Sequence, residues 1–175
     1  MEDNAAEKLR MFGIHRIPLI VTLLLLFLFY MPVKSLELGC FHPSIGAACV
    51  FYWAMNRGQF FGYASAFIVG FIIDIYSTMP FGCSMLMMLL IVVMVNIMKA
   101  YVYPVSFAGR WVEFILVCLV ISAIKYLLIC IYYGEMFSLK EIVLNLLSTV
   151  MFYPLIAYIN LFVQQKFLPP EKINE

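Results

Sequence analysis

Two charged side chains, a carboxylate and an ammonium group, lie inside long apolar runs of this sequence, and both could bind a partner or exchange a proton. Asp74 lies near the end of one run and Lys125 lies within another. A carboxylate or an ammonium group at mid-bilayer depth is costly unless it finds a partner or water. Together the two side chains could form an ion pair or line a wet cavity that faces the outer side of the membrane.

Further polar residues occur at a comparable depth. Asn145 and Thr149 begin the last apolar run. We expect Asp74, Lys125, Asn145 and Thr149 to converge in the outer half of a helix bundle, because each would be costly facing lipid. Simpler roles remain open: Asp74 could cap the turn at 77–78, Lys125 could snorkel to the membrane surface, and the Thr149 hydroxyl could bond to its own helix.

A stripe of small residues leads up to Asp74. Its members recur at intervals of four and are Gly58, Gly62, Ala66 and Gly70. On one helix they would share a face, and small side chains at this spacing let another backbone approach closely. The stripe therefore predicts a helix-packing surface or a partner interface, although a glycine-containing run can also produce it by chance.

No arrangement of residues in the sequence predicts a catalytic centre, a metal site or a cofactor. The only histidines are His15 and His42, and no serine, acid or third ligand is spaced to complete a site with them. The five cysteines are scattered without metal-ligand spacing, and an odd number in apolar runs is typical of small hydrophobic residues.

The elements that must position these residues follow from composition. The chain has 175 residues, of which 65% are hydrophobic and 12% charged, and its mean hydropathy is +1.00. A soluble domain is about half apolar and about a quarter charged, so this composition excludes a cytosolic enzyme. The net charge of +1 with no basic run indicates no nucleic-acid partner.

The apolar runs predict an all-α membrane protein with six transmembrane helices. A membrane domain over 17–163 would lie between a short cytoplasmic N-terminus, 1–16, and a cytoplasmic tail, 164–175. Prolines punctuate the run ends, and Pro154 inside the last run predicts a kink. The six expected spans are 17–33, 38–55, 58–77, 80–102, 111–133 and 142–163.

The distribution of Lys and Arg predicts the orientation of these spans. Only Lys34 and Lys140 fall on the opposite side from the N-terminus, and Lys125 is inside a span. Because cytoplasmic loops carry the positive excess, both termini are expected in the cytoplasm. The eight basic residues on the side of the termini are Lys8, Arg10, Arg16, Arg57, Lys99, Arg110, Lys166 and Lys172.

The middle of the chain resembles the bacterial rod shape-determining protein MreD family. That family shows a polar residue with proline opening the second span and a tyrosine closing it. A G-x-x-x-G-type third span follows, ending in an aspartate with a leucine-glycine or similar pair soon after. The stretches that match are HP at 42–43, FYWA at 51–54, GYASAFIVGFIID at 62–74 and PFG at 80–82.

Carried over residue by residue, Gly62, Gly70, Asp74 and Gly82 match the family motif, whereas Lys125 belongs to no motif of it. The resemblance implies a non-enzymatic, multi-pass subunit of the cell-elongation machinery in the inner membrane. It also implies a fold similar to the six-helix substrate-binding component of energy-coupling-factor transporters. The implied partners are the single-span periplasmic protein MreC, the actin-like MreB, the glycosyltransferase RodA and a class B penicillin-binding protein.

Two functions from different classes follow. The first is a membrane scaffold that binds MreC through helix faces and helps maintain cell shape. The alternative is a vitamin-type substrate-binding subunit of a membrane transporter, in which the same helices would enclose a ligand near Asp74 and Lys125. An intramembrane enzyme would need a nucleophile and a base on facing helices, and the sequence offers no such pair.

Overall fold

The computed structural model describes residues 16–29, 43–77, 80–101, 106–134 and 138–167. These residues form six α-helices and contain no strand, which confirms the all-α prediction for the described part of the chain. The helices are Arg16–Phe29, α2 (Ile45–Arg57), α3 (Tyr63–Tyr76), α4 (Cys83–Tyr101), α5 (Phe107–Tyr133) and α6 (Leu139–Phe167).

Three of these helices are long and apolar enough to cross a membrane. They are α4 with 19 residues, α5 with 27 and α6 with 29. At about 1.5 Å per residue, the 13 residues of α2 and the 14 of α3 reach only about 20 Å, less than the roughly 30 Å hydrocarbon core. The described residues thus contain six helices, of which three are long and apolar enough to cross a membrane, and the crossing of the membrane by all six stays a prediction.

The third predicted span, 58–77, begins too early. Arg57 ends α2, and its carbonyl accepts hydrogen bonds from the backbone N–H groups of Phe60 and Phe61 in a tight turn. Gly62 is extended and precedes the first residue of α3, Tyr63. The helix starts late because glycine is a poor helix former, so the apolar run contains a turn that its hydropathy does not reveal.

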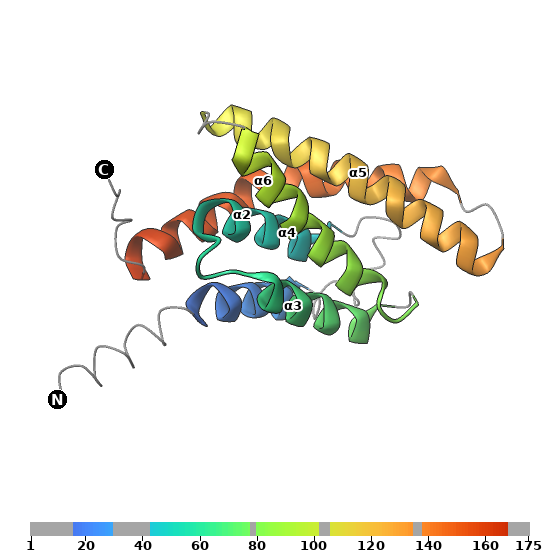
Figure 1. The fold of residues 1–175 in the computed structure, drawn as a ribbon, viewed down its shortest axis with the longest axis horizontal. Coiled ribbons are helices and arrows are strands. Elements are labelled where there is room, and N and C mark those ends of the chain that lie inside the picture. Colours follow the sequence, from blue (N-terminus) through green and yellow to red (C-terminus); the bar gives the residue numbers. More distant parts are fainter. Residues whose placement is uncertain (1–15, 30–42, 78–79, 102–105, 135–137, 168–175) are drawn as a thin grey trace.

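The core of the bundle forms around α2, which has no solvent-facing or lipid-facing side over most of its length. The ten consecutive residues 45–54 are all buried. The helix lies between α4 and α6, with α3 and the helix Arg16–Phe29 beside it (Figure 1). Since α2 is surrounded by protein rather than lipid, it need not span the bilayer by its own length.

Two aromatic contacts join the long helices to this centre. The rings of Phe114 on α5 and Tyr153 on α6 stack with centroids 4.1 Å apart, and Phe51 of α2 packs 5.1 Å from Phe114. Nearby, the Trp111 indole N–H donates to the carbonyl of Val150 at 3.2 Å. Pro154 cannot donate to that carbonyl, so a side chain of α5 satisfies it instead.

Helix Arg16–Phe29 begins at the same end of the bundle at which α6 finishes (Figure 1). This arrangement is consistent with the expectation that both termini lie on one side of the membrane. Arg57, Lys99 and Lys166 all occur in the last turns of helices that finish at this end. The predicted cytoplasmic segments 1–16 and 164–175 lie mostly outside the described residues, and so does His42.

Candidate functional site

Asp74, the acid singled out in the sequence, is buried on α3 and interacts with the start of the next helix. Its side chain is 3% exposed. One carboxylate oxygen accepts from the backbone N–H of Ser84 at 2.9 Å, and the other from those of Gly82 at 2.9 Å and Met85 at 3.4 Å. Asp74 therefore supplies, from a neighbouring helix, the acceptor that the first N–H groups of α4 require.

Two glycines make this contact possible. A Cβ atom at Gly70 would lie 2.5 Å from the Met85 Cα atom and 2.9 Å from its nitrogen, so only glycine allows α3 to approach the α4 backbone. Gly82 has a φ of +99°, a conformation that other residues rarely adopt, and it turns the chain into α4. The two glycines and Asp74 together form the junction between α3 and α4.

The rest of the small-residue stripe divides between several environments. Ala66 is fully buried on α3. Gly58 follows the end of α2, and a Cβ there would lie 3.0 Å from the Lys99 ammonium nitrogen. Among the described residues, nothing lies within 4 Å of a Cβ built at Gly62. The stripe is thus not one helix face, because Ala66 and Gly70 are buried within the bundle, whereas Gly58 and Gly62 precede α3 and Gly62 is exposed.

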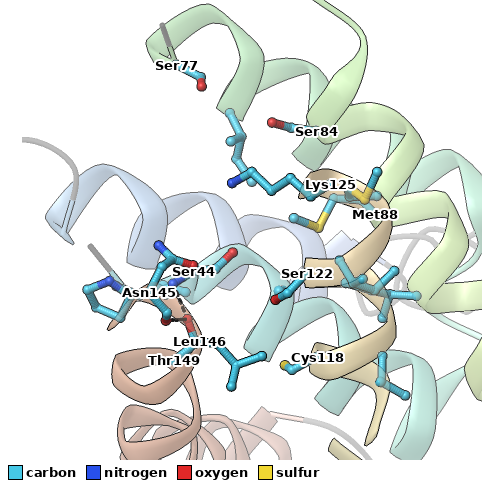
Figure 2. A pocket seen from close by; sticks show the side chains of 18 of the residues that line it. Ser44, Ser77, Ser84, Met88, Cys118, Ser122, Lys125, Asn145, Leu146 and Thr149 are labelled. Carbon is cyan, nitrogen blue, oxygen red and sulfur yellow. Dashed lines mark hydrogen bonds between the residues drawn. The ribbon is translucent and has the colours of Figure 1, made fainter. Parts of the chain in front are cut away.

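A cavity of about 470 Å³ lies between the helices, at the end of the bundle away from Arg57, Lys99 and Lys166. Figure 2 shows side chains that line it. It is placed where α3 ends and where α2 and α4 begin, and α5 and α6 complete its wall. Ile91, Phe114 and Val117 contribute apolar surface near the middle of the bundle. The residues with polar side-chain groups that line it are Ser44, Tyr76, Ser77, Cys83, Ser84, Cys118, Ser122, Lys125, Asn145 and Thr149.

Lys125 is the charged residue among the described residues that line this cavity. It is partly buried on α5, and its ammonium group points inward, with Ser77 and Ser84 on one side and Ser44 and Asn145 on the other (Figure 2). Within the described chain it makes no hydrogen bond or ion pair. It therefore does not pair with Asp74, whose carboxylate is occupied at the α4 N-terminus.

The predicted polar cluster is only partly gathered at this cavity. Lys125, Asn145 and Thr149 line it, whereas Asp74 does not. The Thr149 hydroxyl donates to the Asn145 carbonyl at 2.7 Å and accepts from the Ser44 N–H at 2.9 Å. The hydroxyl thus bonds to its own helix and also holds the start of α2 against α6.

Several polar contacts at the basic end of the bundle were not expected from the sequence. Each contact joins two helices that are distant along the chain, so the spacing of residues in the sequence could not predict it. The only related signal in the sequence was the concentration of basic residues at the ends of the apolar runs. Tyr52 donates to Gln164 at 3.0 Å, Arg110 donates to Asn56, and Lys99 donates to the Ala54 carbonyl.

The arrangement of these groups is suited to binding and packing. Hydroxyls, an amide and one ammonium group surround a space, with apolar side chains beneath them. Among the described residues, no three His, Cys, Asp or Glu side chains gather as a potential metal site. What the cavity presents chemically is a positive charge with hydrogen-bonding groups around it.

Comparison with known proteins gives one match. The family model of rod shape-determining protein MreD matches residues 10–164 of the 175-residue chain. No curated protein and no solved structure matches the chain. The likeness of its fold to the energy-coupling-factor component therefore stays a prediction.

Proposed function

Because the chain belongs to the rod shape-determining protein MreD family, we propose that it is a non-enzymatic scaffold in the peptidoglycan elongation complex. In this proposal it spans the inner membrane with both termini in the cytoplasm and binds MreC, alongside MreB, RodA and a class B penicillin-binding protein. The observation that carries the proposal is the family match over most of the chain, on a helical protein with three helices suited to span a membrane.

The surface that we assign to the MreC transmembrane helix is the outward face of α5. This long helix packs against α4 and α6 and leaves a stripe of exposed apolar side chains from Val112 to Ile131. Twenty residues of helix rise about 30 Å, which matches the length of a single span. The members of the stripe are Val112, Leu116, Leu119, Val120, Leu127 and Ile131.

The family glycines are less suited to this contact. Gly70 already accommodates the α4 backbone, and Gly82 turns the chain at the α3–α4 junction. Gly62 is exposed and stays a candidate for a partner contact, but it is a single position before α3. A docking helix needs a continuous face, because individual interhelical contacts in membranes are weak.

A photocrosslinking experiment tests the assignment. A photoreactive phenylalanine analogue replaces Leu116, Leu119 or Leu127 in cells that express MreC, with Phe67 and Ile75 of α3 as exposed controls. We expect crosslinks to MreC from the α5 positions alone. Crosslinks from α3 without any from α5 would contradict the assignment of the interface to α5. Failure of MreC to co-purify with the unmodified protein would contradict the scaffold function.

One observation favours the alternative function of a transporter binding subunit, namely the cavity of about 470 Å³. Small-molecule sites generally occupy about 300–1,000 Å³. Co-purification from native membranes separates the two functions, since a transporter subunit would bring ATPase and coupling subunits, and a scaffold would bring MreC.

A further inference from the structure

The cavity at the outer end of the bundle has a polar and an apolar part, and this division defines what it could hold. The polar part is built from helix ends: Ser44 precedes α2, Ser77 follows α3 and Ser84 opens α4. The apolar part lies deeper and includes Ile91 in the middle of α4 and Val117 in the first half of α5. A molecule that fits both parts has an apolar body and a polar head.

The charge in the cavity selects the kind of head. Lys125 supplies three N–H donors and no acceptor, and none of these donors bonds to a described residue. Asp74, the nearest candidate for a compensating charge on α3, already accepts hydrogen bonds from the backbone N–H groups of Gly82, Ser84 and Met85 at the start of α4. A cation held in a low-dielectric space without a partner is strongly favourable to an incoming anion.

The neighbours of Lys125 add hydrogen bonds for that anion. Ser122 lies one turn earlier on the same face of α5, and its hydroxyl points into the cavity (Figure 2). Asn145 lies across the cavity on α6. A carboxylate or phosphate beside Lys125 could therefore accept hydrogen bonds from these two helices, and such charge-assisted bonds are the stronger kind.

The geometry points to a binding site for a small amphiphile with one anionic head, either a carboxylate or a phosphate, and an apolar body. Its head lies against Lys125 and Ser122, and its body extends toward Ile91 and Val117. The molecule has two conceivable sources, an acyl lipid from the bilayer or a compound from the aqueous side, and both present the same chemistry. The site does not depend on the scaffold function, because a scaffold and a transporter could each hold such a ligand.

Thermal unfolding of the full chain in lipid nanodiscs tests the site with three probes: decanoate, decyl phosphate and decanol. We expect the two anions to raise the melting temperature by roughly 5 °C at a concentration about a hundred times their Kd, and decanol to have little effect. Equal stabilisation by decanol and decanoate would overturn the proposal, because the head charge would then contribute nothing.

Substitutions at Lys125 test the role of its charge. Lys125→Met should weaken decanoate binding about tenfold or more, whereas Lys125→Arg should retain it. Lys140→Met is the matched control, since Lys140 is an exposed lysine in the first turn of α6 outside the cavity. An unchanged response of Lys125→Met would overturn the proposal.

A second variant keeps the test decisive if Lys125→Met does not fold. Val117→Phe adds volume to the apolar part while leaving the ammonium group in place, and it should abolish stabilisation by decanoate. Stabilisation that survives in Val117→Phe would place the ligand elsewhere and contradict the proposal. MreC co-purification measured on the same variants reports separately on the scaffold function.

Native mass spectrometry of protein purified from its own membranes distinguishes the two sources. A bound single-chain anionic lipid that is lost in Lys125→Met assigns the bilayer as the source. A smaller anionic compound lost in the same variant assigns the aqueous side. An identical set of bound masses in Lys125→Met and in the unmodified protein contradicts the site.

Discussion

At the scale of single residues, Asp74 shows how a carboxylate is tolerated within an apolar helix. The side chain is almost fully buried, yet it accepts hydrogen bonds from three backbone N–H groups, one in the turn before α4 and two in the first turn of α4. These groups lie at the positive end of the α4 dipole and would otherwise be unsatisfied. The Asp74 carboxylate thus supplies hydrogen-bond acceptors for the buried N–H groups at the start of α4. In return, these N–H groups stabilise the buried charge of the carboxylate.

The first prediction concerns the charge of Asp74. We expect Asp74→Asn to lower the free energy of unfolding by about 1–2 kcal/mol, because an amide has one acceptor oxygen and its NH₂ group would face the N–H donors of α4. Unfolding in mixed detergent micelles measures the change. Glu141→Gln, an exposed acid in the first turn of α6, is the control. Equal stability of the Asp74 variant would mean that the contact contributes nothing.

The second prediction separates two glycines that the sequence pattern treats alike. Gly70→Ala should destabilise the protein by about 1–3 kcal/mol, because the new methyl group would collide with the Met85 backbone. Gly62→Ala should change stability by no more than about 0.5 kcal/mol, since no described residue lies within 4 Å of its Cβ position. The same unfolding assay compares the pair, and similar effects would contradict the close approach of α3 and α4.

At the scale of helices, the sequence predicted the existence of each element better than its limits. Long apolar runs located α5 and α6 because hydropathy persists throughout such a helix. The third helix was expected to start at residue 58 because the apolar run begins there, and the small residues at intervals of four agreed with one continuous helix. Periodicity cannot show that a turn interrupts the run, whereas the extended backbone of Gly62 does.

The third prediction concerns the contact between Trp111 and the carbonyl that Pro154 leaves unsatisfied. Trp111→Phe should cost about 1 kcal/mol, because the Val150 carbonyl would lose its donor in an apolar environment. In a Pro154→Ala background the helix supplies its own N–H, so the cost of Trp111→Phe should shrink. A double-mutant cycle measures this coupling, and additive effects would show that the two features are independent.

At the scale of the whole molecule, the central position of α2 and the cavity beside it could not be predicted from the sequence. Because most predicted spans are strongly apolar, composition does not show which of the helices lies at the centre of the bundle. The polar residues were grouped because each was expected to need a partner, and only their similar depth suggested that Asp74 and Lys125 would meet. Which groups Asp74 and Lys125 contact depends on the rotation of α3 and α5 about their own axes, and a single sequence does not allow this rotation to be predicted.

The fourth prediction concerns the orientation of the bundle. Ser138→Cys and Ser106→Cys place single thiols at exposed positions before α6 and α5, in a background with the five native cysteines replaced. We expect a membrane-impermeant maleimide to label Ser138→Cys in intact spheroplasts and Ser106→Cys only after permeabilisation, because the basic residues mark the cytoplasmic side. Reversed labelling would invert the proposed topology.

The bond between Asp74 and the start of α4 also has a consequence for biogenesis. While the ribosome has released α3 but not yet α4, the carboxylate has none of its three N–H partners. Lateral release of α3 alone from the translocon would expose an uncompensated charge to lipid. The two helices should therefore leave the translocon as a paired hairpin, with Asp74 delaying the insertion of the first until the second has been synthesised.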